Sequence, residues 1–287
     1  MTATSDQPLA SSGFGIQWNV PLAIGVIGVA AFLATALFAP WISPYDPEAI
    51  DTSSRLQSFN ASHWLGTDEY GRDTLSRIIY GGRVSLFVAA IAVGIGTVVG
   101  ALVGMTAGFV GGRVDAVLMR SMDLVFSFPA ILLAVVITGA LGSSLENAMI
   151  AIGIIFIPGF ARFARSLTRS VMLEQFIAYA RSTGIPAWRT ILVDVLPNVA
   201  PGLAVQAMVA IGYAVTLEAT LSFLGLGAQP PTPSWGNMID AGRGFMGRAP
   251  LMVIAPVVAI FIVVLSTNLL GDGLQALRDK RQTKGDE

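Results

Sequence analysis

The chain lacks several residue types on which enzymes and small extracellular domains rely. None of its 287 residues is cysteine, which excludes disulfides and thiolate metal sites. A single histidine, His63, cannot build a cluster of histidine ligands, so it is interpreted as a loop residue and no metal is expected. Lysine occurs only at Lys280 and Lys284, so the glycine-rich phosphate loop that ends in Gly-Lys-Ser/Thr cannot form. We therefore expect no bound cofactor and no ATP hydrolysis by this route.

Charged residues are also scarce. They make up 12% of the chain, whereas roughly 25% is usual in a soluble domain. Hydrophobic residues make up 54%, and the mean hydropathy is +0.69. The net charge of −1 gives no reason to expect a nucleic-acid partner. This composition predicts an all-α, polytopic integral membrane protein.

Long uncharged tracts mark the membrane spans, each of which needs about 20 mostly apolar residues. The tract at 147–161 is shorter, but snorkelling of Arg162 would extend it. The tract at 219–239 is rejected, because its many Gly and Pro residues would leave backbone groups unsatisfied in lipid. Residues 1–19 hold no Lys or Arg and no small-residue cleavage site closes the next run, so no cleaved signal peptide is expected. The six predicted spans are Val20–Ile42, Val84–Val110, Leu124–Leu141, Asn147–Ala161, Val195–Leu217 and Ala249–Gly271.

Six spans place both termini on one side, and the distribution of Lys and Arg decides which side. With cytoplasmic termini, eleven of the 17 Lys and Arg residues lie inside and six outside, so this orientation is expected. The predicted organisation is a cytoplasmic N-terminal tail (1–19), a six-helix membrane domain (20–275) and a cytoplasmic C-terminal tail (276–287). The membrane domain includes an outer segment (43–83), a cytoplasmic loop (165–195) and an outer loop (219–248).

The cytoplasmic loop contains a charged, broken stretch, IAYARSTGIPAWRTILVDVLPNVAP, at residues 177–201. Good helix formers over Glu174–Thr183 predict a short helix, which Gly184 ends at its C′ position and Pro186 prevents from continuing. A second piece is expected from Ala187 to Val195, ending before the next span. A short exposed helix between two spans is suited to docking on another protein, and the alternative is an ordinary surface loop without a partner.

This broken stretch resembles the "EAA" loop of bacterial ATP-binding-cassette (ABC) importer permeases. Ala178, Tyr179 and Ala180 fill the EAA places, Gly184 is the glycine and Leu196-Pro197 the closing pair. Most of the chain is similar to the C-type permease subunit of the dipeptide/oligopeptide/nickel importer family. The stretches that carry this likeness are His63–Leu86, Gly111–Pro129, Leu217–Gly236 and Asn268–Leu274.

The loop departs from the family's pattern at three places. Ala178 stands where the family often has an acidic or small residue, Tyr179 where it has a second Ala, and Asp194 where it usually has His. We expect these differences to change the detailed contacts of the loop, together with a matched change in its partner.

The resemblance implies an ABC importer permease fold with a cytoplasmic coupling helix and a division of labour among separate chains. The implied partners are a second permease subunit forming a heterodimer, two cytoplasmic ATPase subunits that bind ATP, and an extracytoplasmic substrate-binding protein. The implied cargo is a di- or oligopeptide, with nickel, glutathione or opines as alternatives. The implied ATPase-coupling residues are Ala178, Tyr179, Ala180, Arg181, Gly184, Pro186, Trp188, Leu196 and Pro197, and the candidates for a translocation path or outer gate are Glu218 and Asn268.

Two other classes of function are considered. A secondary transporter or channel would be indicated by inverted repeats with helices broken at mid-membrane, and the sequence gives no sign of either. An intramembrane enzyme would need a catalytic constellation, but neither a Ser-His-Asp set nor paired carboxylates on one helical face are present.

Several further polar residues have two interpretations. Glu218 could line a passage for a cationic amine, or accept hydrogen bonds from backbone amides of the Leu224–Gly227 turn, and the second role is favoured. A charged outer cluster, Asp68 with Arg72 and Asp73, could contact the binding protein, but a role in folding the outer segment is favoured.

Two helix-surface features are also predicted. Asp123 and Arg120 are expected to form a surface pair, since they lie three residues apart on a helix. Glycines on one helical face suit close helix packing, and these are Gly94, Gly96, Gly100 and Gly104.

Overall fold

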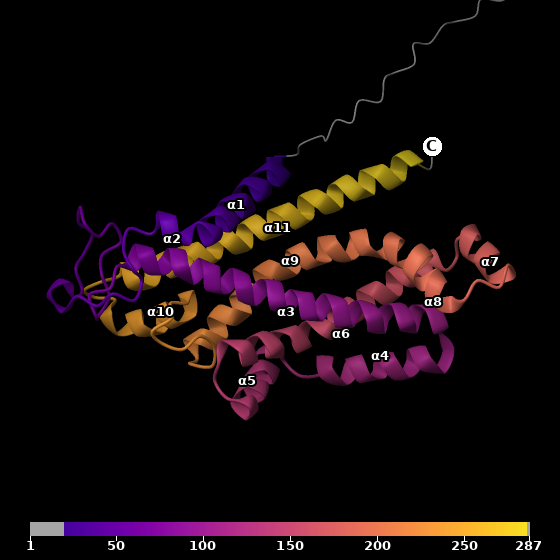
Figure 1. The fold of residues 1–287 in the computed structure, drawn as a ribbon, viewed down its shortest axis with the longest axis horizontal. Helices are drawn as coiled ribbons and strands as arrows, with labels where there is room; N and C mark the ends of the chain where they lie inside the picture. The colour runs from indigo at the N-terminus through magenta and orange to yellow at the C-terminus, as the bar shows by residue number, and fades with distance from the viewer. Residues whose placement is uncertain (1–19, 286–287) are drawn as a thin grey trace, which may run out of the picture.

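The computed structural model describes residues 20–285, and every regular element in that range is helical (Figure 1). The helices are α1 (Val20–Leu37), α2 (Ala39–Ile42), α3 (Thr74–Val110), α4 (Gly112–Phe126), α5 (Ala130–Leu141), α6 (Leu145–Val171), α7 (Gln175–Ser182), α8 (Ala187–Arg189), α9 (Leu196–Phe223), α10 (Trp235–Gly242) and α11 (Leu251–Gly285). Single turns η1 (Thr52–Ser54) and η3 (Arg243–Phe245) are 3-10 helical, and η2 (Thr190–Val195) is π-helical. The all-α prediction is confirmed.

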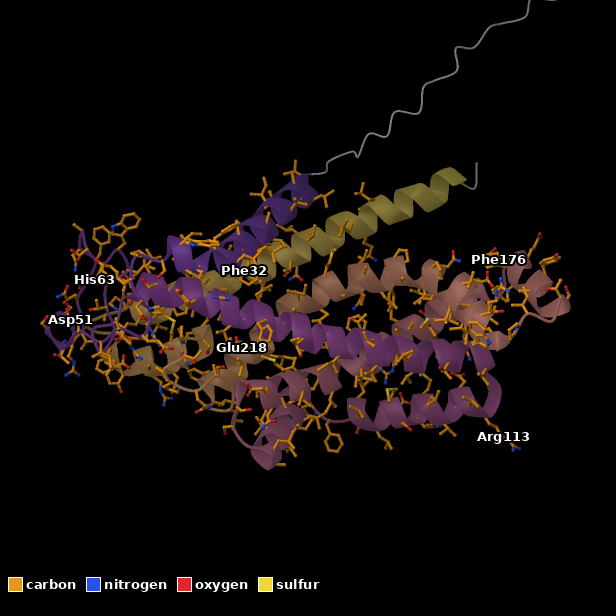
Figure 2. The ribbon with its side chains drawn as sticks, in the orientation of Figure 1. Phe32, Asp51, His63, Arg113, Phe176 and Glu218 are labelled. Carbon is orange, nitrogen blue, oxygen red and sulfur yellow. The ribbon has the colours of Figure 1, made fainter. Side chains whose placement is uncertain are left out.

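The helices run between two ends of the molecule. Residues 43–73, the loop after α9 and α10 gather at what we call the loop end, and the α3–α4 turn, α7 and α8 lie at the opposite α7 end (Figure 1). The labelled side chains of His63 and Asp51 mark the loop end, and those of Phe176 and Arg113 mark the α7 end (Figure 2). The predicted tail 1–19 lies outside the described residues, and α11 continues through residues 276–285 of the predicted C-terminal tail.

Five helices are long and apolar enough to cross a membrane, and α4 with α5 would make a sixth span as a bent pair. The prediction of one straight span over Leu124–Leu141 is wrong, because the two helices meet at 86° across a break at Ser127–Pro129. Pro129 lacks a backbone N–H and disfavours helical backbone at Phe128, so the helix stops there. With 12 residues, α5 is about 18 Å long, which is short of the roughly 30 Å hydrocarbon core. The sequence interpretation, which recognised no broken helices, missed this break.

Close packing of α3 on α6 forms the centre of the fold. A Cβ added at Gly96 would lie 2.4 Å from the Phe156 side chain, and one at Gly104 would lie 2.1 Å from the Ala161 carbonyl oxygen. These glycines therefore let the two helix backbones approach. The predicted glycine face is confirmed except for Gly94, whose added Cβ would meet no atom within 4 Å, and it continues instead to Gly108.

At the loop end, charged side chains are buried and bonded to one another. Asp68 accepts a 2.6 Å hydrogen bond from Arg72 Nε and lies 3.6 Å from Arg77 Nε. Asp73 caps α3 by accepting from the Ser76 backbone N–H at 2.8 Å, and its other oxygen lies 2.9 Å from His63 Nδ1. These contacts support the favoured folding role of the outer cluster, and they add Arg77 and His63 to it.

Candidate functional site

The broken stretch forms a short helix, a turn and the start of a long helix. The predicted helix over Glu174–Thr183 is confirmed as α7, and Gly184 follows it with φ of 72°. The Ile185 N–H donates to the Ala180 carbonyl at 3.1 Å, the bond that joins C″ to C3 in a Schellman ending. Glycine suits this position because a left-handed backbone brings a Cβ too close to its own carbonyl.

The second predicted piece does not end before Leu196. The helix that begins at Ala187 continues through π-helical η2 into α9, so 187–223 is one long helix. Pro197 is accommodated because it lies in the first turn of α9, where the backbone hydrogen-bond pattern changes from π-helical to α-helical.

The two faces of α7 differ in burial. Ile177 and Ala180 are buried, whereas Tyr179 is 69% exposed and Phe176 is 43% exposed. Beyond the turn, Trp188 is 64% exposed. The outer face of this stretch therefore offers aromatic side chains that nothing in the described chain covers.

The implied coupling residues are divided between these faces. Ala178, Gly184, Pro186 and Pro197 are also exposed, and Leu196 is half-buried. Of Arg181, only the backbone position in α7 is described.

Ion pairs that the sequence interpretation missed join α4 to α6. Asp115 accepts from Arg165 Nε and Nη2, the second bond at 2.6 Å, and from Arg169 Nη2 at 2.6 Å. Asp123 accepts from Arg162 Nη2 at 2.8 Å, so the predicted pair with Arg120 is wrong. The spacing in the sequence indicated these pairs. The two aspartates are eight residues apart and the three arginines are three and four residues apart, so each set shares one face of its helix.

Glu218 is fully buried between α3 and the end of α9 (Figure 2). Ser85 Oγ donates to its Oε2 and Ser222 Oγ to its Oε1, each at 2.8 Å. The Ala228 backbone N–H donates to Ser222 Oγ at 3.1 Å, so Glu218 supports the loop after α9 through a serine rather than by binding backbone amides directly. Asn268 is exposed on α11, whereas Glu218 is buried, so the two candidate gate residues do not line a common surface.

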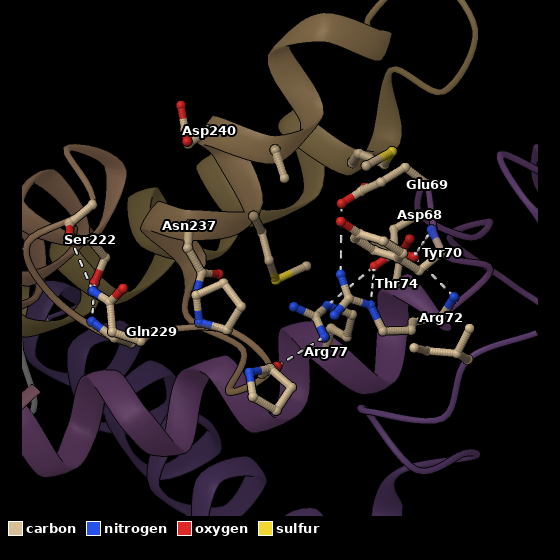
Figure 3. Close-up of a pocket in the computed structure, with 18 residues that line it drawn as sticks. Asp68, Glu69, Tyr70, Arg72, Thr74, Arg77, Ser222, Gln229, Asn237 and Asp240 are labelled. Atoms are coloured by element: carbon tan, nitrogen blue, oxygen red, sulfur yellow. Dashed lines mark hydrogen bonds and ion pairs between the residues drawn. The ribbon is translucent and has the colours of Figure 1, made fainter. Parts of the chain in front are cut away.

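The described residues enclose several cavities outside the α7 stretch, and we compare two of them. One of about 550 Å³ at the loop end is lined by charged side chains of residues 68–77 and by the loop after α9 (Figure 3). The other, of about 680 Å³, lies between the α4–α5 break, α6 and α9, and its walls carry five aromatic side chains. These are Phe126, Phe128, Phe156, Phe160 and Tyr213. Among residues 20–285, no group of three or more His, Cys, Asp or Glu side chains could hold a metal ion.

Comparison with known proteins decides the family. The profile described as "Binding-protein-dependent transport system inner membrane component" matches residues 80–284. The chain belongs to this family. A second profile, "N-terminal TM domain of oligopeptide transport permease C", matches residues 21–60, so the predicted C-type permease is confirmed.

Similar curated proteins cover nearly the whole permease. The dipeptide transport system permease protein DppC of Alkalihalophilus pseudofirmus is 41% identical over 90% of this chain and 85% of its own. The glutathione transport system permease protein GsiD of Shigella dysenteriae is 43% identical over 88% and 84%. The probable D,D-dipeptide transport system permease protein DdpC of Escherichia coli is 38% identical over 94% and 92%.

A solved structure shares the permease fold. A chain of the MetNI methionine ABC transporter in inward-facing conformation has a TM-score of 0.59 and 19% identity, over 71% of this chain and 97% of that one. Family and fold together identify a membrane component of a binding-protein-dependent transport system.

Proposed function

We propose that the permease is one of two membrane subunits of an ABC importer for short peptides, and that ATP is bound and hydrolysed by separate cytoplasmic subunits. The observation that carries this proposal is the α7 stretch. It is a short helix between two spans, ended by Gly184 and flanked by exposed aromatics, and it is suited to entering a groove on another protein. The absence of a phosphate-loop lysine supports placing the ATPase on another chain.

The partners follow from this division of labour. An extracytoplasmic binding protein would deliver cargo at the loop end, and two ATPase subunits would dock at the α7 end. A second, different permease would complete the passage.

The orientation is proposed from the Lys and Arg distribution, with α7 in the cytoplasm and residues 43–73 outside. Because the chain has no cysteine, an introduced thiol is its only one. Ser58→Cys and Ser182→Cys suit labelling, since both positions are exposed. In intact cells an impermeant thiol reagent is expected to label position 58 only, and labelling at 182 alone would reverse the orientation.

A peptide cargo is proposed because relatives at about 40% identity are named for dipeptide and glutathione transport. Glutathione is the second candidate, supported by the 43% identity of the GsiD protein. Uptake of labelled dipeptide and labelled glutathione by cells that carry the complete importer, each competed with the other, decides between them.

The docking role of α7 is tested at Gly184. An added Cβ there would meet no atom within 4 Å, so a substitution acts through the backbone alone. Gly184→Val places a β-branched residue at positive φ, which costs about 1–3 kcal/mol locally and redirects α7. We expect normal membrane levels but loss of ATPase-subunit retention and of uptake.

Gly184→Asn is the matched control, because Asn tolerates a left-handed backbone. It should keep most of the activity. Retention and uptake are measured by pull-down and by substrate accumulation, each normalised to permease in the membrane. If the valine variant behaves like the asparagine variant, α7 is an ordinary surface loop.

A further inference from the structure

Helix α4 is attached to the rest of the permease mainly through charge. Its one buried residue is Asp115, and none of its side chains belongs to the apolar core of the described residues. The apolar side chains on the Asp115 face are only half-buried, and these are Leu118, Met119, Met122 and Val125. A helix of 15 residues that buries so little apolar surface is positioned by its specific polar contacts.

Those contacts form two connections to α6. At the α7 end, the Asp115 carboxylate, 8% exposed, receives the fork of Arg165 and a further bond from Arg169. Two turns further along α4, Asp123 pairs with Arg162, whose Cζ also lies 4.3 Å from the centroid of the Phe126 ring. A bidentate guanidinium–carboxylate contact constrains orientation as well as distance, so α4 is held to α6 in register.

The two connected helices lead to different functional parts. After Val171, α6 passes through three residues into α7, the proposed docking helix. After Phe126, α4 enters the Ser127–Pro129 break, whose residues line the 680 Å³ aromatic cavity. The α4–α6 contacts therefore lie between a docking helix and a cavity wall.

We propose that this α4–α6 ion-pair linkage transmits displacement of α7 to the Ser127–Pro129 break and so changes the width of the aromatic cavity. The proposal rests on the docking role of α7 proposed above and adds the residues that carry its motion into the membrane. The break is suited to act as the hinge, because a few element-terminal residues absorb such changes in backbone angle. Asp115 and Asp123 are positioning residues in this scheme, since neither lines the cavity.

The main variant is Asp115→Asn, studied in the complete importer reconstituted in lipid vesicles. The amide cannot replace the charge-assisted bonds from two arginines. We expect membrane level and ATPase-subunit retention within about twofold of the parent, and uptake of labelled dipeptide or glutathione reduced about tenfold with ATP hydrolysis continuing. Arg120→Gln is the matched control, because Arg120 is an exposed charge on the same helix that forms no ion pair with the described residues. Unchanged uptake per ATP hydrolysed in Asp115→Asn overturns the linkage.

Charge reversal covers the case in which Asp115→Asn fails to fold. Asp123 and Arg162 are both partly exposed, so each can be replaced without burying a lone charge. Asp123→Arg and Arg162→Asp are each expected to lower uptake per ATP hydrolysed, and the double variant to restore it by at least half. Equal defects in the single and double variants contradict the proposal.

A probe in the break measures the motion directly. Ser127→Cys provides the only thiol of the chain, at an exposed position in the cavity wall. An environment-sensitive fluorophore there is expected to change its emission when ATP is added to the complete importer, and to change much less when Asp115→Asn is also present. An equal change in both overturns the linkage. If the parent complex retains no ATPase subunit and takes up neither cargo, the proposed function itself has failed.

Discussion

The loop end and the α7 end both expose aromatic side chains, but they differ in what lies beneath. At the loop end, Trp64 and Phe59 are exposed, and the same segment contributes a network in which buried Asp68 pairs with buried Arg72 and Arg77. At the α7 end, Tyr179 and Trp188 stand on a stretch that is anchored mainly by two buried apolar side chains, Ile177 and Ala180.

The loop end also connects segments that are distant in sequence. Arg77 Nη1 donates to the Pro47 carbonyl at 2.9 Å, and Trp235 Nε1 donates to the Ile78 carbonyl at 2.9 Å, joining α10 to α3. Hydroxyls of Ser53 and Ser54 that donate to Asp51 hold the pKa of this exposed carboxyl below its usual range. The loop end is thus held by hydrogen bonds and ion pairs among its own residues, whereas α7 has few buried contacts, which is typical of elements that move or that await a partner.

The largest expected effect comes from breaking the loop-end network. Asp68→Asn removes a buried charge that faces two buried arginines, and leaving such charges uncompensated costs about 3–5 kcal/mol. We expect little folded permease in the membrane and a much lower unfolding temperature in detergent. Asp240→Asn, in an exposed pair, should change stability by less than about 1 kcal/mol. If the two variants had similar stability, the buried ion pairs of the loop end would contribute no more to the free energy of unfolding than an exposed pair does.

An intermediate effect is expected at the α3–α6 contact, which joins the two ends. A Cβ at Gly104 would lie 2.1 Å from the Ala161 carbonyl oxygen, so Gly104→Ala should destabilise by about 1–3 kcal/mol. Gly94→Ala meets no atom and should stabilise α3 slightly, by about 0.5–1 kcal/mol. Thermal unfolding of the two alanine variants in detergent tests this difference. Equal shifts of the unfolding temperature would show that the stability of the α3–α6 contact does not depend on close approach of the two helices.

The smallest effect on stability is expected at the surface of the α7 end. Trp188→Ala removes an exposed side chain, so the free energy of unfolding should change by less than about 0.5 kcal/mol. If Trp188 is an anchor for the ATPase subunit, binding should weaken by about 2 kcal/mol, roughly 30-fold. Titration of ATPase subunits onto detergent-solubilised permease measures this. A stability loss without an affinity loss would place Trp188 in the fold rather than in the interface.

Much of the fold follows from local features of the sequence. Uncharged tracts indicated five of the six spans, four by their length and the one at 147–161 with the help of snorkelling by Arg162, because a helix satisfies its own backbone in lipid whatever its neighbours are. The end of α7 was equally local, since Gly184 and Pro186 suffice to stop a helix. The prediction failed at Leu124–Leu141 because hydropathy averages over a tract, whereas a single Pro129 decides whether that tract is one helix or two.

By itself, the sequence determined the membrane class, the positions of most spans, the helix–turn stretch at 175–189 and the family motifs. The tertiary structure alone decided which charges meet. Asp123 pairs with Arg162 and not with Arg120, and Asp115 pairs with two arginines of α6. Glu218 is hydrogen-bonded by one serine of α3 and one of α9. The physical reason is that helical spacing sets which residues share a face, but only the packing of one helix on another sets which faces meet.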